Sequence, residues 1–326
     1  MKKGPTLDSR ALEVFLAVCE AGSMTAAARG LGVTQGSVSQ QIARLEALLD
    51  VRLLDRQTRE LRLLPAGLTL QHHARRVMEE LRATGHAMEQ ARGLRFPGLS
   101  VQIMDTLSRT LTTPVVEVLQ DHADQLQVSA LVHYRHRDDL VAGKVDMVIT
   151  SLEFDPAVYE VHPIAEEPVI LLAPRGVLRS DQVELEELAG LLPLIRYGRQ
   201  RYMGLLGDQY LARHMIPIVR SIEVDQATAV IDAVQAGRGW AITAPFSLLD
   251  PAFDAAGIDV RSLPRPVPKR AITLVTRPGL FRDLPARLAA ACRAHLRDQI
   301  DRHLNGIVPT SDCPVLTGPL QDPSRP

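Results

Sequence analysis

The residues with the clearest chemical pattern lie between positions 34 and 45. Val38, Ile42 and Leu45 recur at helical spacing and predict one buried stripe on a helix. The opposite face of that helix carries polar or basic residues, which are Thr34, Gln35, Ser37, Ser39, Gln40 and Arg44, and Gly36 is a further candidate for DNA contact. Side chains of this kind hydrogen-bond base edges and phosphates in the major groove of DNA. The pattern therefore favours a helix that contacts DNA.

A second short helix is predicted immediately upstream. Ser23 is a candidate N-cap and Thr25 follows it, while three alanines at 26–28 allow close packing against a neighbouring helix. Gly32 stands where a tight turn needs a residue without a Cβ. Residues 22–45 thus predict a helix–turn–helix, and the absence of any acidic residue between Glu20 and Glu46 favours an anionic partner. An ordinary helical hairpin without DNA-binding function is the alternative.

A small β-hairpin, or wing, is predicted after the second helix. Two short apolar runs, Val51–Leu54 and Leu61–Leu64, flank a polar centre. Arg56 and Arg59 lie in that centre, where arginines can bind phosphates or enter the minor groove. A solvated charged loop is the alternative.

Together these features resemble the winged helix–turn–helix of LysR-type transcriptional regulators. The matching residues are Phe15, Gly22, Ser23, Ala27, Ala28, Leu31, Val33, Thr34, Gln35, Val38, Ser39, Gln41, Ile42, Leu45, Glu46, Leu53, Leu54, Arg56, Arg59, Pro65, Ala66 and Gly67. The sequence departs from the family pattern at Gly36, Gln40 and Leu64, where a proline, a basic residue and a threonine are usual. Gln40 could read adenine instead of contacting phosphate or guanine.

Length and charge agree with a DNA-binding head on a larger body. A chain of 326 residues is long enough for two or three compact units. Its formal net charge is −1, but residues 1–92 carry 13 Lys and Arg against 10 Asp and Glu. The head is therefore slightly basic and the rest slightly acidic.

The cysteines and the hydropathy indicate a cytoplasmic protein. Cys19, Cys292 and Cys313 show no paired spacing, which predicts a reducing compartment and neither a disulfide framework nor a zinc site. Cys19 falls on an apolar stripe and is expected to pack in a core. The basic N-terminus lacks a following apolar run, and no stretch approaches the ~20 apolar residues of a membrane span.

A long connecting helix is predicted over residues 66–92. This stretch contains no proline, and an apolar seam recurs at alternating spacings of four and three through Leu70, Ala74, Val77, Leu81, Thr84, Met88 and Ala91. Such a narrow seam favours pairing with a second helix, so we predict a dimerisation linker. A surface helix packed on its own body is the alternative. In the resembled family this helix pairs two winged heads, and a two-fold dimer matches two DNA half-sites.

The remainder predicts an α/β body. Gly93 and Gly98 with the intervening proline mark a boundary, after which strands alternate with helices as in βαβ units. A helix opened by Pro114 is expected over Thr113–Leu119. The predicted fold class is α/β, with an α-helical winged helix–turn–helix N-terminal domain and a two-lobed α/β effector-binding domain.

The same family resemblance extends to this body. The matching residues are Gly143, Asp146, Ile149, Pro163, Ile164, Val169, Ile170, Leu171, Gly237, Gly239, Ala241 and Ile242. It implies a DNA-binding domain at 1–65, a linker at 66–92 and an effector-binding domain at 93–302. Lobe I is expected at about 98–165 plus 270–302, and lobe II at about 166–269. The tail at 303–326 is rich in proline and is predicted to be disordered.

Effector-binding residues are predicted at the carboxyl ends of strands, where helix N-termini favour polar ligands. These candidates are Asp105, Thr106, Ser108, Thr150, Ser151, Arg196, Tyr197 and Asp225. Plain helix capping is the alternative for each of them. Asp105 and Asp225 suggest an effector with an amine as well as an acid. Trp240 is expected either in the core or as a stacking wall of the cleft.

The sequence thus predicts a dimeric or tetrameric regulator that binds double-stranded DNA and responds to a small polar metabolite. RNA polymerase is an expected partner if the protein activates transcription; a membrane is not. No catalytic constellation, metal site or cofactor motif is evident, so an enzyme is not expected. The alternative is a ligand-independent DNA-binding regulator whose lobes serve only oligomerisation.

Overall fold

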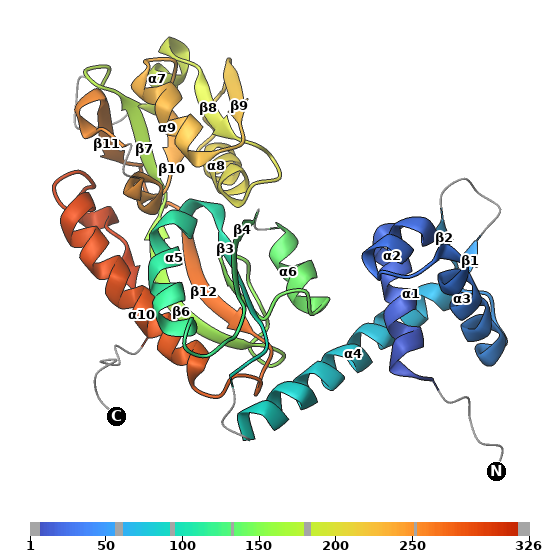
Figure 1. The fold of residues 1–326 in the computed structure, drawn as a ribbon. Helices are drawn as coiled ribbons and strands as arrows, with labels where there is room; N and C mark the ends of the chain where they lie inside the picture. The colour runs from blue at the N-terminus through green and yellow to red at the C-terminus, as the bar shows by residue number, and fades with distance from the viewer. Residues whose placement is uncertain are drawn as a thin grey trace. The chain divides into compact units, whose positions relative to one another are not determined.

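The computed structural model describes residues 7–55, 61–91, 95–131, 134–178, 184–250 and 253–318. The chain divides into two compact units, one ending at Gly93 and the other beginning at Leu94 (Figure 1). Each unit is described by itself.

Three helices form the core of the first unit. They are α1 (Ser9–Ala21), α2 (Met24–Gly30) and α3 (Gln35–Leu49). Val18 of α1, Ala28 of α2 and Ile42 of α3 belong to one buried cluster. The Ser23 and Thr34 hydroxyls accept backbone N–H bonds from Ala26 and Ser37, at 3.4 Å and 3.2 Å. These caps start α2 and α3 where the sequence predicts, and the turn at Gly32 has a φ of +66°.

A two-stranded wing follows α3 and leads into a long helix. β1 (Leu54–Asp55) pairs antiparallel with β2 (Arg62–Leu63), and α4 covers Pro65–Ala91. Glu46 of α3 fixes the wing, since its Oε1 accepts N–H bonds from Leu53 and Leu54 at 2.8 Å and 3.3 Å. A Cβ at Gly67 would lie 2.3 Å from the Leu53 carbonyl oxygen, so only glycine permits this approach of α4 to the wing.

The second unit contains two lobes. Lobe I is a six-stranded sheet in the order β13-β6-β12-β5-β3-β4, and its helices α5 and α10 pack against each other (Figure 1). The bounds are β3 (Leu99–Met104), α5 (Asp105–Leu119), β4 (Leu126–Leu131), α6 (Tyr134–Val141), β5 (Met147–Thr150), β6 (Glu160–Pro168), β12 (Lys269–Thr276), α10 (Leu284–Gln299) and β13 (Val315–Leu316). The pairs β3–β4 and β3–β5 are parallel, and β12 pairs antiparallel with β5 and β6.

Lobe II is smaller and is built from two short sheets. One has the order β10-β7-β11 and the other pairs β8 with β9, and a bridge between Leu194 and Trp240 links them. The bounds are β7 (Ile170–Pro174), α7 (Leu185–Leu191), β8 (Leu194–Tyr197), α8 (Tyr202–Arg213), β9 (Ser221–Val224), α9 (Ala227–Gln235), β10 (Ala241–Thr243), the 3-10 helices η1 (Pro245–Leu249) and η2 (Ala255–Gly257), and β11 (Ile258–Ser262).

The chain crosses between the lobes on two adjacent strands. It leaves lobe I at the end of β6 and returns at the start of β12, where Val169 N donates to the Pro268 carbonyl over 3.1 Å. Two-stranded crossings of this kind allow one lobe to move against the other.

The prediction for the first helix of lobe I is wrong about where it begins. The helix starts at Asp105, directly after β3, rather than at Thr113, and Pro114 lies inside it. Leu107, Leu111 and Val115 are buried at intervals of four. Their packing outweighs the preference of proline for a first helical turn, because helix stability in proteins comes mainly from the buried face.

The predicted disorder of the tail is wrong for residues 303–318. A π-helix, η3 (Ile300–Leu304), and a 3-10 helix, η4 (Thr310–Asp312), continue the chain, and β13 pairs antiparallel with β6. The buried Asp312 carboxylate bonds the Ser262 hydroxyl and lies 3.3 Å from Arg265. The proline-rich composition predicted disorder, because composition does not reveal contacts with segments that are distant in sequence. Residues 319–326 lie outside the described residues.

In the described part of the chain, no single helix is long and apolar enough to span a membrane. Among these residues, α1 and α2 are long and apolar enough for a span only when taken together, and they are bent by 119° to each other.

Candidate functional sites

The first candidate site is the exposed face of α3 in the head. Gln35, Gly36, Gln40 and Arg44 are exposed along it, whereas Ser37 and Ser39 are half-buried. Thr25 is exposed at the start of α2. These side chains leave amide, hydroxyl and guanidinium groups open to a ligand, so the face can hydrogen-bond base edges and phosphates.

Two of the predicted DNA-contact residues have a structural role in the head. The hydroxyls of Ser23 and Thr34 accept helix-capping bonds, so their acceptor capacity is partly used within the protein. Arg56 and Arg59 fall in the stretch 56–60, outside the described residues. Arg52 and Arg62, at the two ends of the wing, are exposed.

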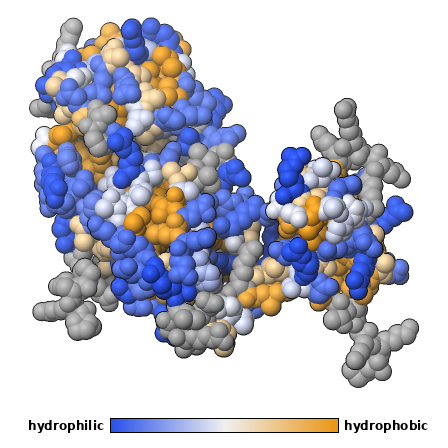
Figure 2. All heavy atoms as spheres, in the orientation of Figure 1, coloured by the Kyte–Doolittle hydropathy of each residue, from blue (hydrophilic) through white to orange (hydrophobic). Residues whose placement is uncertain are grey.

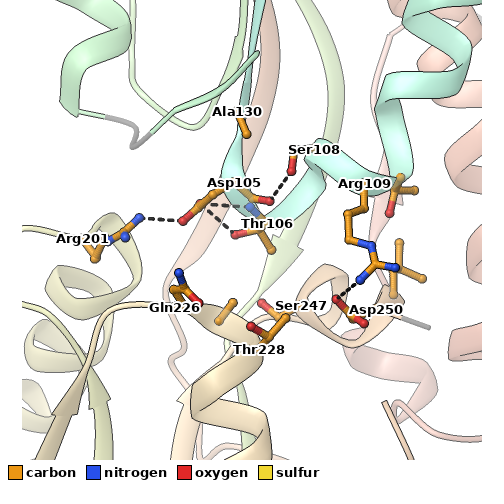
Figure 3. A pocket seen from close by; sticks show the side chains of 13 residues that line it. Asp105, Thr106, Ser108, Arg109, Ala130, Arg201, Gln226, Thr228, Ser247 and Asp250 are labelled. Carbon is orange, nitrogen blue, oxygen red and sulfur yellow. Dashed lines mark hydrogen bonds and ion pairs between the residues drawn. The ribbon is translucent and has the colours of Figure 1, made fainter. Parts of the chain in front are cut away.

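The second candidate site is a cavity of about 280 Å³ between the two lobes (Figure 3). Lobe I contributes the first turn of α5 and the end of β4, and lobe II contributes the start of α9 and the end of η1. The lining residues are Asp105, Thr106, Ser108, Arg109, Thr110 and Ala130 from lobe I, and Arg201, Gln226, Ala227, Thr228, Ser247, Leu249 and Asp250 from lobe II. Hydroxyl, amide and charged groups therefore surround a space large enough for a small polar molecule.

Two ion pairs cross this cavity with opposite polarity. Asp105 Oδ2 of lobe I lies 2.6 Å from Arg201 Nη1 of lobe II, and Arg109 Nη1 of lobe I lies 3.5 Å from Asp250 Oδ2 of lobe II (Figure 3). Each lobe thus presents one acid and one base to the other. Both pairs are partly exposed to solvent, so a ligand that offers an anion and a cation can compete for their partners.

A smaller annex adjoins the cavity. Its volume is about 30 Å³, and it shares Asp105, Thr106, Arg201 and Ala227 with the main cavity. Its other lining residues are Met104, Ser151, Tyr197, Tyr202, Met203, Asp225 and Arg270. Burial raises the pKa of the Tyr197 phenol, whose hydroxyl is 2.7 Å from the Thr243 hydroxyl. Tyr197 is therefore a neutral wall of the annex at physiological pH.

The combination of a winged head and a two-lobed α/β unit has a clear match among known families. The family model described as "Bacterial regulatory helix-turn-helix protein, lysR family" matches residues 9–68, and the "LysR substrate binding domain" model matches residues 95–301. The chain belongs to the LysR family. It is a LysR-type transcriptional regulator with an effector-binding domain, not an enzyme, and the predicted family and fold class are confirmed.

Named relatives agree over most of the chain. The "Probable RuBisCO transcriptional regulator" of Trichormus variabilis is 27% identical over 291 residues, which cover 86% of this chain and 85% of the relative. The "DNA-binding transcriptional dual regulator OxyR" of Escherichia coli is 26% identical over 313 residues, covering 93% and 100%. The structure of full-length CbnR complexed with its target DNA aligns with a TM-score of 0.52 at 26% identity, covering 90% and 100%.

Within this regulator, six of the predicted effector residues line the cavity or its annex. They are Asp105, Thr106 and Ser108 around the main cavity, with Ser151, Asp225 and Tyr197 at the annex. Tyr197 lines the annex from the end of β8. The rule that ligands lie beyond the carboxyl ends of strands therefore located this side of the cleft.

Three predicted effector residues are placed elsewhere. The Thr150 side chain is buried and its hydroxyl accepts the Leu152 N–H, and Arg196 forms an ion pair with Asp208 of α8. Trp240 is 0% exposed, and its indole nitrogen donates to the Leu192 carbonyl over 3.2 Å. Trp240 thus packs in the core of lobe II instead of forming a wall of the cleft, and its backbone just before β10 bridges to Leu194 of β8.

Several cavity residues were not predicted from sequence. Arg109 lies one turn into α5, beyond the expected loop, because the helix begins earlier than predicted. Thr228, in the first turn of α9, could have been found by the strand-end rule that located Asp225. Asp250, Ser247 and Arg270 carry no local signal, since only the return of the chain between the lobes brings them to the cleft.

The three cysteines lie in settings that disfavour the reactive thiolate form. All are free, and burial is the main cause that raises the pKa of each thiol, to about 12 for Cys19 and Cys292. A reactive cysteine instead needs a lowered pKa and solvent access. Among the described residues, no group of three or more His, Cys, Asp or Glu side chains could hold a metal ion.

Proposed function

We propose that this regulator changes its DNA binding when a small polar metabolite binds between the lobes of its effector domain. The observation that carries the proposal is the cavity of about 280 Å³ whose walls come from both lobes and whose two ion pairs join them. A ligand that contacts both lobes binds some lobe angles better than others, so it shifts the population among them.

The DNA contacts are assigned to the head. Gln35 and Gln40 would read base edges and Arg44 would bind phosphate, because all three are exposed on α3. Thr25 of α2 and, on the sequence pattern alone, Arg56 and Arg59 would add to this interface. Two heads would insert their α3 helices into major-groove half-sites one helical turn apart.

The dimer is assigned to the second half of α4. Leu70 and Ala74 pack within their own head, so they are not available to a partner. Val77, Leu81 and Met88 are 46%, 49% and 55% exposed, and hydrophobic residues are visible along α4 in Figure 2. We therefore shorten the predicted dimerisation seam to the part that begins at Val77. Leu81→Glu should shift the protein toward monomers in sedimentation experiments, whereas Arg76→Glu, at an exposed site outside the seam, should not.

The effector is proposed to carry both an acidic and an amine group. The support is the reversed polarity of the two ion pairs, which offers guanidinium groups to an anion and carboxylates to an amine. Asp105→Asn removes one carboxylate charge and keeps the side-chain shape. It should weaken binding of an amine-containing effector, and unchanged affinity would remove the amine from the proposal.

The experiment that tests the proposal is a thermal-shift screen of the full-length protein. The panel consists of amino acids, amines, organic acids and sulfonates. A ligand at ~100 times its dissociation constant should add ~2.7 kcal/mol to the free energy of unfolding. Each hit is then added to a binding assay with DNA from next to the protein's own gene. Hits that alter DNA affinity or footprint support the proposal. A flat screen would favour lobes that serve assembly alone.

A further inference from the structure

A buried ion pair joins the two strands that cross between the lobes. Arg270 is the second residue of β12 and lies directly opposite Glu167 of β6, with 2.5 Å between Arg270 Nε and Glu167 Oε1. The two residues are 1% and 0% exposed. Glu167 Oε2 also accepts the Phe246 N–H over 2.7 Å at the start of η1. The pair therefore ties the crossing strands to the segment that supplies Ser247 and Asp250 to the cavity.

One donor of this buried arginine is unused. Arg270 Nη2 is buried and has no hydrogen-bond partner among the described residues. A buried charged donor without a partner is costly, so most such groups in proteins bind a ligand, an ion or water. Arg270 lines the annex, and its charge opposes the burial-driven rise in the pKa of Tyr197, another annex residue. The guanidinium is thus beside the space that adjoins the main cavity.

The annex is small and mixed in charge. Its volume of about 30 Å³ corresponds to roughly two water-sized groups, which suits the head group of a ligand whose body lies in the main cavity. Of its carboxylates, Asp105 is paired with Arg201, while Asp225 is exposed to solvent. The buried Arg270 therefore offers a positive donor to an anion, and the exposed Asp225 offers a negative charge to an amine.

We infer that the annex is a carboxylate site in which Arg270 Nη2 binds the acidic group of the effector. This inference rests on the proposed function and adds to it the residue that recognises the acid. A carboxylate bound at Arg270 would lie next to the Glu167–Arg270 pair, and Glu167 connects that pair to η1 through the Phe246 N–H. The acidic group would therefore be recognised where the chain crosses between the lobes. Neutral analogues would leave the Arg270 donor without a partner.

The test uses acetate, which carries the carboxylate and little else. The melting temperature of the full-length protein is measured with sodium acetate, with sodium chloride at equal ionic strength, and with acetamide as the uncharged match. Acetate should raise the melting temperature in a saturable way and acetamide should not. Equal effects of acetate and chloride would overturn the inference.

Two double variants locate the site. Glu167→Gln with Arg270→Gln removes both buried charges together, and it should weaken acetate binding about tenfold or more, as for loss of a charge-assisted hydrogen bond. Glu166→Gln with Lys269→Gln changes the neighbouring exposed pair, 2.7 Å apart on the same strands, and should keep the acetate response. Retention of the response in the first variant would contradict the inference.

A third variant keeps the inference testable if the first does not fold. Ser151→Asp places a carboxylate in the annex, so it should raise the melting temperature without acetate and abolish the acetate response. A lower melting temperature together with a normal acetate response would overturn the inference.

The proposed function and the carboxylate site at Arg270 can fail independently of each other. A screening hit that still binds the Glu167→Gln, Arg270→Gln protein would leave the proposed function intact while removing Arg270 from it. If acetate binds at Arg270 but no ligand alters DNA binding, the carboxylate site would stand and the proposed function would fail.

Discussion

The DNA-binding face and the effector cleft are assembled in opposite ways. The face of α3 consists of side chains within ten residues of sequence, and its helix is started by a bond from Ser37 N to the Thr34 hydroxyl three residues away. The cleft is held by partners such as Asp105 and Arg201, which are 96 residues apart. A local face can be predicted from periodicity, whereas a cleft between lobes depends on where the chain crosses and returns.

The two regions also differ in how charge is used. The described part of the head exposes Gln35, Gln40 and Arg44 on α3, and such groups suit a polyanion that brings its own partners. The effector unit pairs its acids with its bases across the cavity and buries one such pair at the crossing strands. Mutations should therefore affect DNA affinity in the head and stability or ligand response in the effector unit.

The largest effect is expected from breaking the buried pair. Glu167→Ala leaves Arg270 buried without its carboxylate partner, which should lower the free energy of unfolding by about 3–5 kcal/mol. Glu166→Ala, in the exposed pair with Lys269, should cost less than about 1 kcal/mol because solvent screens that pair. Urea unfolding of both variants measures the difference. Equal losses of unfolding free energy in the two variants would show that burial does not make the Glu167–Arg270 pair more important for stability than the exposed pair.

The next effect concerns the C-terminal segment. Asp312→Ala removes the buried carboxylate that bonds Ser262 and lies near Arg265, and should cost about 1–3 kcal/mol of unfolding free energy. Asp298→Ala changes an exposed carboxylate that pairs with Arg302 one helical turn away, and serves as the control. If both variants unfold at the same urea concentration as the wild type, the segment contributes nothing to the stability of the effector unit.

A comparable effect in the head should appear in binding rather than in stability. Gln35→Ala should weaken binding to the specific DNA site by about 1–3 kcal/mol if the amide reads a base. Gln41→Ala makes the same change at a half-buried position of α3 and should leave specificity unaltered. Fluorescence anisotropy on specific and scrambled DNA separates the two. If the Gln35→Ala variant keeps the sequence preference of the wild type, Gln35 does not read a base.

The smallest effect is expected from oxidants. With a thiol pKa of about 12, only about one in 10⁴ molecules of Cys19 or Cys292 is a thiolate at pH 8, and the fraction rises as the pH increases toward 12. Hydrogen peroxide should therefore leave DNA affinity unchanged at neutral pH, and iodoacetamide should label these cysteines slowly in the native protein. Rapid loss of DNA affinity in peroxide, restored by a thiol reductant, would contradict this assignment.

The family resemblance explains why so much of the architecture could be predicted. Helix caps, the turn at Gly32 and the apolar stripe of α3 are local features, and the two-lobed body follows from alternating strands and helices with family motifs. The errors arise where distant contacts decide the outcome. Packing of Leu107 and Leu111 extends α5 on the N-terminal side of Pro114. Pairing of β13 with β6 orders part of the tail.

The kind of protein and the face of α3 could be predicted from the sequence alone, because capping, periodicity and residue type act over a few positions. The fold was needed to see that Trp240 packs in the core and that Arg109 and Asp250 meet at the cavity. It also brings Arg270 to the annex, with a donor that has no partner among the described residues. Burial and ion pairing depend on neighbours from distant segments, and the crossing strands bring those segments together.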